Sequence, residues 1–149
     1  MEIPEIKLKR AKELVNTSRH IALATTNEDG SPHNSPVRFL HDEKLEYIYW
    51  GSNMEALHSQ NVLRTGQLFG VLFDRIEHGG VYMKCESGHL LSGKGLEVGL
   101  EIINAEREKE GTAKIPLEYY SADGVQKLWS AKITNIWINM PVRDENGFI

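Results

Sequence analysis

The clearest candidate for a ligand site is the stretch Ser52–Asn53–Met54–Glu55, which is followed by His58. Its Ser-x-x-Glu spacing is that of a capping box, in which the two side chains support the start of a helix. A helix that begins directly after a strand also presents unpaired N–H groups and a positive dipole end, which suit a phosphate. His58 lies inside the predicted helix and adds a donor, whereas the Glu55 carboxylate competes with the phosphate. A plain helix cap and a phosphate site are therefore both open interpretations.

Other motifs of enzyme chemistry are incomplete. The segment from Gly88 to Gly95 has the Gly-x4-Gly-Lys spacing of a phosphate-binding loop, but Gly95 stands where a Mg²⁺-binding Ser or Thr is required. We predict instead a strand end and a turn into a helix. The six histidines are scattered, and Cys85 is the only cysteine. Neither a zinc site nor a Gly-x-Ser-x-Gly hydrolase nucleophile is predicted.

The composition is that of an ordinary globular domain. The chain has 149 residues, within the ~100–200 residues usual for one domain. Its net charge of −4 offers no general attraction to nucleic acid. Because the lone Cys85 cannot form an internal disulfide, we expect a reducing compartment. The first residues lack a signal-peptide pattern and no apolar run reaches the ~18 residues of a membrane span, so we expect a cytoplasmic protein without membrane contact.

Hydrophobic periodicity predicts short strands with few helices between them. Apolar residues at helical spacing indicate helices over 4–18, 54–64 and 93–110, and a short helical turn over 125–128. Strands are indicated over 21–26, 33–40, 45–50, 68–73, 81–91 and 131–140. The Asp29–Gly30 pair predicts a hairpin turn between the first two strands. The strand over 68–73 is apolar on both faces, which predicts burial on both sides.

This order of elements predicts a mostly β fold, an antiparallel barrel with appended helices rather than a parallel α/β sheet. We predict a single domain over 1–149. It comprises an N-terminal helix over 1–19, the core barrel strands over 20–92, a helical and irregular insertion over 93–129, and a closing strand and tail over 130–149.

A longer stretch of the sequence resembles a known family. Residues 22–37 read as a small-apolar strand, an acidic-Gly turn, Pro-His and then Ser-Pro-Val. At the usual distances there follow Tyr49–Trp50–Gly51–Ser52, His58–Ser59–Gln60–Asn61 and Phe73–Asp74. In this order and spacing the chain resembles the pyridoxamine 5′-phosphate oxidase-like FMN-binding split barrel superfamily over residues 20–90.

The resemblance implies a six-stranded antiparallel split β-barrel that forms a homodimer and binds FMN in two grooves between the protomers. In the family, the strand that matches Ser35, Pro36 and Val37 runs beside the isoalloxazine ring and offers it backbone groups. The strand end that matches Trp50 and Ser52 lies near the ribityl-phosphate arm.

The resemblance also implies a phosphate site completed by a helical segment that matches His58 and Asn61. Arg38 and Arg64 are candidates for a compensating cation, and we include Arg38 among the cofactor-binding residues. We expect the stretch 112–129, which holds Tyr120 and Trp129, either to form a second wall of the groove or to pack on the barrel.

The sequence departs from the authentic oxidases of this family. Those enzymes carry an Arg near Ser35 and a Ser-Arg-Lys run where this chain has Ala56–Leu57–His58, so vitamin B6 is not implied as the substrate. We expect a smaller relative, an FMN-binding oxidoreductase that passes electrons between a reductant and a small acceptor. The flavin supplies the redox chemistry, so no catalytic residue is nominated. The alternative is a non-catalytic module that binds flavin, haem or a deazaflavin.

Overall fold

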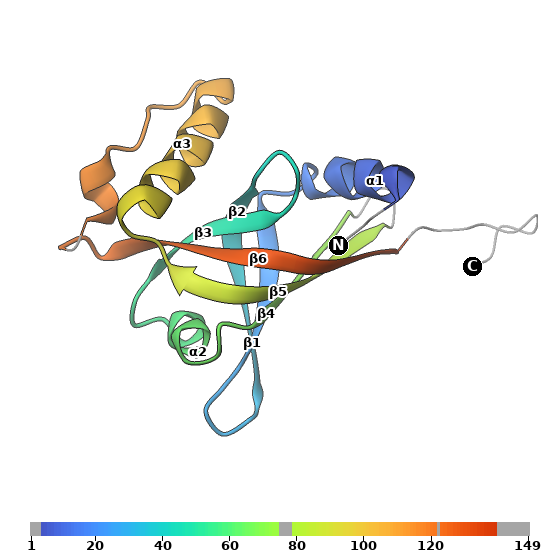
Figure 1. Ribbon diagram of the computed structural model, residues 1–149, viewed down its shortest axis with the longest axis horizontal. Helices are drawn as coiled ribbons and strands as arrows, with labels where there is room; N and C mark the ends of the chain where they lie inside the picture. The colour runs from blue at the N-terminus through green and yellow to red at the C-terminus, as the bar shows by residue number, and fades with distance from the viewer. Residues whose placement is uncertain (1–3, 75–78, 122, 140–149) are drawn as a thin grey trace, which may run out of the picture.

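The strands close into a barrel in the computed structural model, which describes residues 4–74, 79–121 and 123–139. Six antiparallel strands follow one another around the barrel in the order β1-β2-β3-β6-β5-β4, which confirms the predicted architecture (Figure 1). The strands are β1 (His20–Thr26), β2 (Pro32–His41), β3 (Tyr47–Asn53), β4 (Leu68–Phe73), β5 (Gly80–Leu90) and β6 (Gln126–Asn139). The helices are α1 (Glu5–Val15), α2 (Leu57–Thr65), α3 (Gly93–Lys109) and the 3₁₀ turn η1 (Leu117–Tyr120).

Alternating side chains of the strands fill the barrel interior. Trp50 of β3 and Trp129 of β6 are both buried there, and their rings stack with centroids 6.4 Å apart. On α1, Ala11, Leu14 and Val15 belong to the same core. The helices α1 and α2 pack on opposite sides of the barrel, while α3 and η1 lie together at a third place on its outside (Figure 1).

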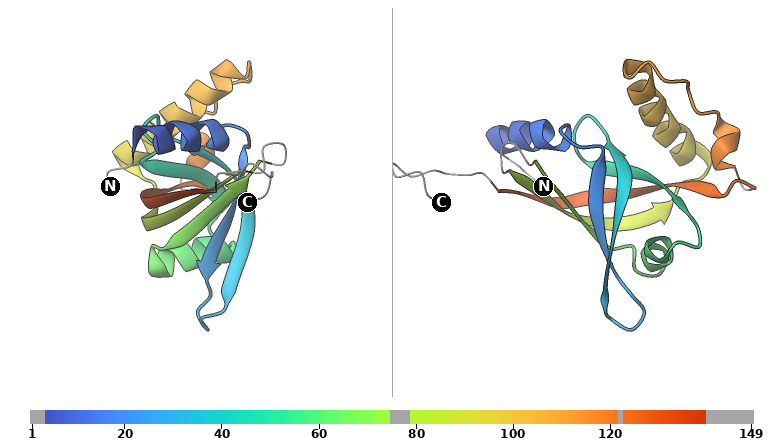
Figure 2. Two further views of the ribbon diagram at one scale, coloured as in Figure 1. Left: turned by 90° about the vertical axis from the view of Figure 1, so that its right-hand side faces the viewer. Right: turned by 180° about the vertical axis from the view of Figure 1, so that it is seen from behind.

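The first hairpin turns at Gly30, as the Asp29–Gly30 pair predicts. Gly30 has φ of +85°, in the left-handed region that a residue without Cβ adopts at little cost. The Asn27 N–H donates to the Ser31 carbonyl at 2.9 Å and closes the turn. Figure 2 shows this hairpin reaching beyond the body of the barrel.

Three predicted features are wrong, two of them because strand pairing extends further than the local sequence indicates. Residues 51–53, which lie beyond the strand predicted over 45–50, belong to β3 and pair with residues 126–128 of β6. The helical turn predicted over 125–128 is therefore replaced by the beginning of β6. The helix predicted from Met54 begins only at Leu57, after a turn.

The prediction that β4 is buried on both sides is wrong for the single chain. Its inward side chains are buried, but Phe69 and Val71 on the outer face are only half-buried. Phe73, on the same face, is 68% exposed. The outer face of β4 thus leaves apolar surface uncovered.

Parts of the predictions lie outside the described residues. These are residues 1–3, residues 75–78 between β4 and β5, residue 122, and residues 140–149, which include Met140 of the predicted closing strand and the predicted tail. Among the helices of the described part, none is both long enough and apolar enough to cross a membrane.

Candidate functional site

The strands β2 and β3 separate after a short paired segment. They pair only between residues 39–41 and 48–50, so residues 32–38 of β2 pair with β1 alone. The Phe39 N–H donates to the Arg19 carbonyl at 3.0 Å, on the β1 side. Because backbone groups alternate in direction along a strand, those of Asn34 and Pro36 point toward the edge that lacks a partner strand. Pro36 has no N–H, which suits an unpaired edge.

A cluster of hydroxyl and imidazole groups lies where β3 ends and α2 begins. Ser52 Oγ is 2.7 Å from His58 Nε2, and the Ser59 hydroxyl donates to Ser52 Oγ at 3.1 Å. Ser52 and Ser59 are buried and His58 is half-buried. The Ser52 carbonyl accepts a hydrogen bond from Trp129 Nε1 at 3.2 Å, which ties the end of β3 to the core. The sequence-predicted pair of Ser52 and His58 is thus brought together.

The N-terminus of α2 is not closed by a side chain. The capping box predicted for Ser52 and Glu55 is wrong, because the N-cap is Ala56, which has extended backbone and no side-chain cap. Asn53 Oδ1 instead accepts the Glu55 N–H at 2.9 Å in the turn before the helix. Glu55 is exposed, and no acidic residue lies in the first turn. The first N–H groups of α2 therefore remain suited to an anion.

Burial weakens the basicity of the imidazole in this cluster. The pKa of His58 is lowered first by burial, which disfavours the charged ring, and second by the nearby His33. His33 Nε2 lies 2.9 Å from Ser35 Oγ, on the same face of β2. At neutral pH, His58 is therefore an uncharged hydrogen-bonding group. A bound anion would stabilise the protonated, charged form of its ring.

Asn61 holds α2 against the first hairpin. Its Nδ2 donates to Thr25 Oγ1 at 3.0 Å and to Asn27 Oδ1 at 2.9 Å, and its side chain is buried. Arg64, on the same helix, donates to the carbonyl of Thr26. With both amide hydrogens in use, Asn61 positions the helix rather than presenting a free donor.

The other predicted site residues lie apart from this cluster. The Trp50 ring is in the core, where its Nε1 has no hydrogen-bond partner among the described residues. Arg38 points away from the barrel interior and pairs with Glu110, the C-cap residue of α3, at 3.3 Å. Val37 is buried, and Pro36 is exposed on the unpaired edge. Trp129, for which both an outer wall and packing on the barrel were open, is buried in the core.

Two polar residues were not among the predicted site residues: Ser59 of the cluster, and His33, which influences His58 electrostatically. Alternation along β2 places His33 on the same face as Ser35, a signal that the sequence contains. Ser59 directly follows His58, but only the fold brings its hydroxyl to Ser52. Within the described residues, no group of three or more His, Cys, Asp and Glu side chains is arranged to hold a metal ion.

Solved structures share this architecture. No protein-family model matches the sequence, and no curated protein sequence matches it significantly. A Clostridium acetobutylicum protein related to a general stress protein of the pyridoxinephosphate oxidase family is 17% identical, with a TM-score of 0.66 over 93% of this chain and 91% of its own. A Listeria innocua protein described as a putative pyridoxamine 5′-phosphate oxidase is 16% identical, with a TM-score of 0.66 over 89% and 97%.

A third similar structure is HutZ, described as the haem storage protein of Vibrio cholerae. It is 15% identical, with a TM-score of 0.67 over 87% of this chain and 92% of its own. At these identities the likeness concerns the fold alone. The chain therefore has the split-barrel fold that its sequence resembles.

Proposed function

We propose that the protein binds FMN where β2 and β3 separate, that it does so as a homodimer, and that it is an oxidoreductase. The observation that carries the proposal is the cluster of Ser52, His58 and Ser59 at the open N-terminus of α2. Bound FMN supplies the electron transfer between a reductant and a small acceptor. The chain binds and orients the flavin.

The donor set at the start of α2 suits the phosphate of FMN. Two hydroxyl groups, one imidazole and the uncapped N–H groups of α2 converge there, and the helix dipole adds positive potential. Glu55, a competitor in the sequence, lies in the turn before the helix and is exposed. His58 takes up a proton more readily beside a phosphate dianion, which offsets the scarcity of permanent cations.

The unpaired edge of β2 suits the flavin ring. An isoalloxazine needs a flat, largely apolar slot with a few backbone donors and acceptors along its polar edge. The backbone of Asn34 and Pro36 points toward this edge, and no strand of the described residues covers it. Pro36 offers its backbone carbonyl to this edge, whereas the backbone groups of Ser35 and Val37 point toward β1. Ser35, Pro36 and Val37 together stay proposed as the segment of β2 that runs beside the ring.

An uncharged row on the outer barrel surface supports a second copy as partner. Cross-strand pairing places Pro36 beside Ala22, Ala22 beside Val71, Val71 beside Tyr82, and Tyr82 beside Trp137. The row crosses five adjacent strands without a charged side chain, and uncovered apolar surface of this kind marks interfaces. It begins at Pro36, on the strand that is proposed to hold the flavin ring.

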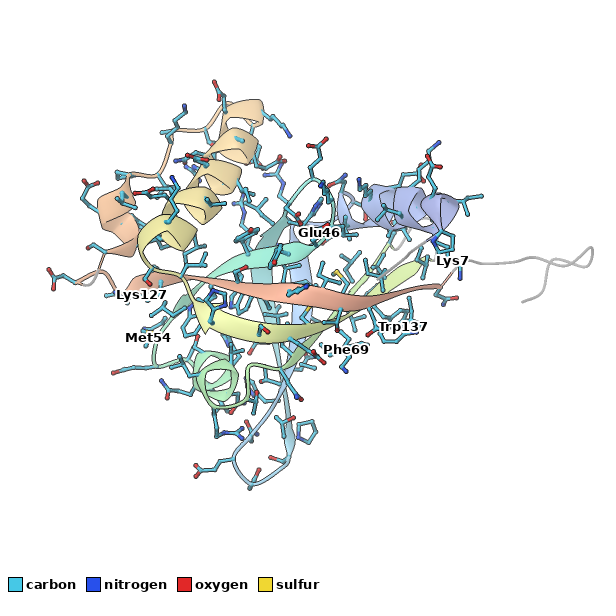
Figure 3. The ribbon with its side chains drawn as sticks, in the orientation of Figure 1. Lys7, Glu46, Met54, Phe69, Lys127 and Trp137 are labelled. Atoms are coloured by element: carbon cyan, nitrogen blue, oxygen red, sulfur yellow. The ribbon has the colours of Figure 1, made fainter. Side chains whose placement is uncertain are left out.

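Aromatic side chains next to this row strengthen the same argument. Phe69 of β4 and Trp137 of β6 lie side by side, with ring centroids 5.9 Å apart (Figure 3). Trp137 is 49% exposed and Phe73 is 68% exposed. A two-fold dimer through this face buries the row against itself and supplies the second wall that a flavin groove requires.

The decisive test is spectroscopic. The purified protein is expected to show flavin absorbance, or to take up FMN on titration, and released cofactor is then identified. Absence of both contradicts FMN binding. Reduction of the bound flavin by NADH or NADPH, followed by stopped flow with candidate acceptors, separates an oxidoreductase from a protein that only holds the flavin.

A haem-binding module is the second candidate. His33 and His58 lie close enough to influence each other, and a neutral imidazole such as His58 offers a lone pair to iron. HutZ, which shares the fold, is described as a haem storage protein. A Soret band on haem titration, lost in the double variant His33→Ala/His58→Ala, favours haem; competition between FMN and a deazaflavin tests the remaining alternative.

A further inference from the structure

A cavity of about 160 Å³ lies between α3, η1 and the outer face of β2 and β3. Its apolar wall and its polar groups come from Leu40, Ile103, Ile115, Arg38, Arg107 and Tyr120. Since one water needs about 10–15 Å³ of such space, the cavity has room for a ligand of roughly ten non-hydrogen atoms. Leu40 and Tyr49 line it from the face of the sheet opposite to the Ser52 side chain, because side chains alternate along a strand. Phe39, Trp50 and Gly51 also line it, so the cavity adjoins the point where β2 and β3 separate.

The walls of this cavity are held in place by hydrogen bonds. Asn104 of α3 donates to the Ile115 carbonyl at 3.0 Å and accepts the Ile115 N–H at 2.8 Å. Arg107 Nε donates to the Ala113 carbonyl. The Thr112 N–H donates to the Arg107 carbonyl at 2.9 Å. The irregular segment after α3 is thereby fixed onto the helix, so little order has to be created when a ligand enters.

Positive charge in this cavity is incompletely neutralised. No ion pair between described residues includes Arg107. Glu106, the acidic residue that lines the cavity, pairs with Lys109 at 3.4 Å. Glu110 is shared by two arginines, one of which, Arg38, also lines the cavity. The positive charge of Arg107, which no carboxylate among the described residues pairs with, therefore favours a ligand that carries one negative charge.

Tyr120 offers an unused donor beside this charge. No hydrogen bond between residues of the described part uses its hydroxyl, which lies 3.6 Å from the position that a Cβ on Gly51 would occupy. Burial raises the pKa of Tyr120, while Arg107 and Arg38 lower it. The hydroxyl is therefore protonated at neutral pH and able to donate.

We propose that this cavity binds a small organic monoanion with an apolar body, of the class of monocyclic carboxylates. The Arg107 guanidinium and the Tyr120 hydroxyl hold the carboxylate, because the planar fork of an arginine matches two carboxylate oxygens. Leu40, Ile103 and Ile115 contact the apolar body. The proposal does not depend on FMN binding.

Benzoate is the probe and benzamide is its neutral control of the same shape. Binding of each is measured by calorimetry to the full-length protein, with circular dichroism to confirm the fold of every variant. We expect saturable binding of benzoate and much weaker binding of benzamide. Tyr120→Phe, which removes a single oxygen, is expected to weaken benzoate binding about 10-fold or more, as for a hydrogen bond to a charged group.

Arg107→Gln is expected to weaken benzoate binding further, whereas Lys114→Gln is expected to leave it unchanged. Lys114 is an exposed cation on the same segment that does not line this cavity, so it controls for general electrostatic attraction. The proposal is overturned if the parent shows no saturable benzoate binding, if benzamide binds equally well, or if folded Tyr120→Phe binds benzoate like the parent. Flavin absorbance of the same samples reports FMN binding separately.

Discussion

Replacing His58 by alanine is expected to weaken FMN binding while leaving riboflavin binding nearly unchanged. His58 contacts Ser52 Oγ at 2.7 Å and lies in the first turn of the uncapped α2. A hydrogen bond to a charged group contributes about 1.5–3 kcal/mol. Solvent reaches the half-buried ring, so screening favours the lower half of this range. That corresponds to an increase in Kd of about 10- to 40-fold.

Quenching of flavin fluorescence gives both dissociation constants on the same samples. Riboflavin is the critical control because it carries the same ring without the phosphate. His89→Ala is the matched protein control, since His89 is an exposed histidine of β5. Its ring hydrogen-bonds to the Ser87 carbonyl at 2.8 Å and takes no part in the Ser52 cluster. An unchanged FMN affinity, or an equal loss for riboflavin, would refute the assignment of His58 to the phosphate.

Three further predictions concern stability and assembly. Because the pKa of His58 is lowered on folding, the unfolded chain takes up a proton more readily, and the free energy of unfolding falls as pH drops below about 6.5. In urea melts, His58→Gln should lose less of its free energy of unfolding than the parent between neutral and acidic pH. An equal loss in both proteins would contradict this. Trp137→Lys should convert the proposed dimer to a monomer in light scattering, whereas Ile6→Lys, at an exposed position of α1, should not. If Trp137→Lys has the same mass as the parent, the proposed interface is contradicted. Gly99→Ala puts a Cβ 2.9 Å from Leu128 Cδ2. The overpacking costs about 1–3 kcal/mol and the higher helix propensity of alanine returns about 1 kcal/mol, so the urea midpoint should fall or stay unchanged. A higher midpoint argues against close packing of α3 at this position.

Elements governed by local chemistry follow from the sequence. The strand predicted over 68–73 coincides with β4, and the helix predicted over 93–110 differs from α3 by one residue. The turn at Gly30 has the positive φ that Asp29–Gly30 indicates. In each case the periodicity of neighbouring side chains, or the backbone freedom of one glycine, decides the conformation without help from distant residues.

Features that depend on distant partners were decided by tertiary structure. Residues 51–53 continue β3 because residues 126–128, far along the chain, pair with them. That extension places Ser52 in a strand and leaves Ala56 as the N-cap of α2, so the apparent capping box does not form. Arg38 pairs with Glu110, 72 residues away, rather than with the phosphate cluster.

The sequence by itself determined an antiparallel barrel with appended helices and named Ser52 and His58 as a candidate pair, because alternation, turn chemistry and spacing are local. Only the tertiary structure joined their side chains with Ser59 and opened the edge of β2 beside Pro36. The cavity lined by Arg107 likewise exists only in the tertiary structure. A ligand site is a set of distances between residues far apart in the chain, and packing sets those distances.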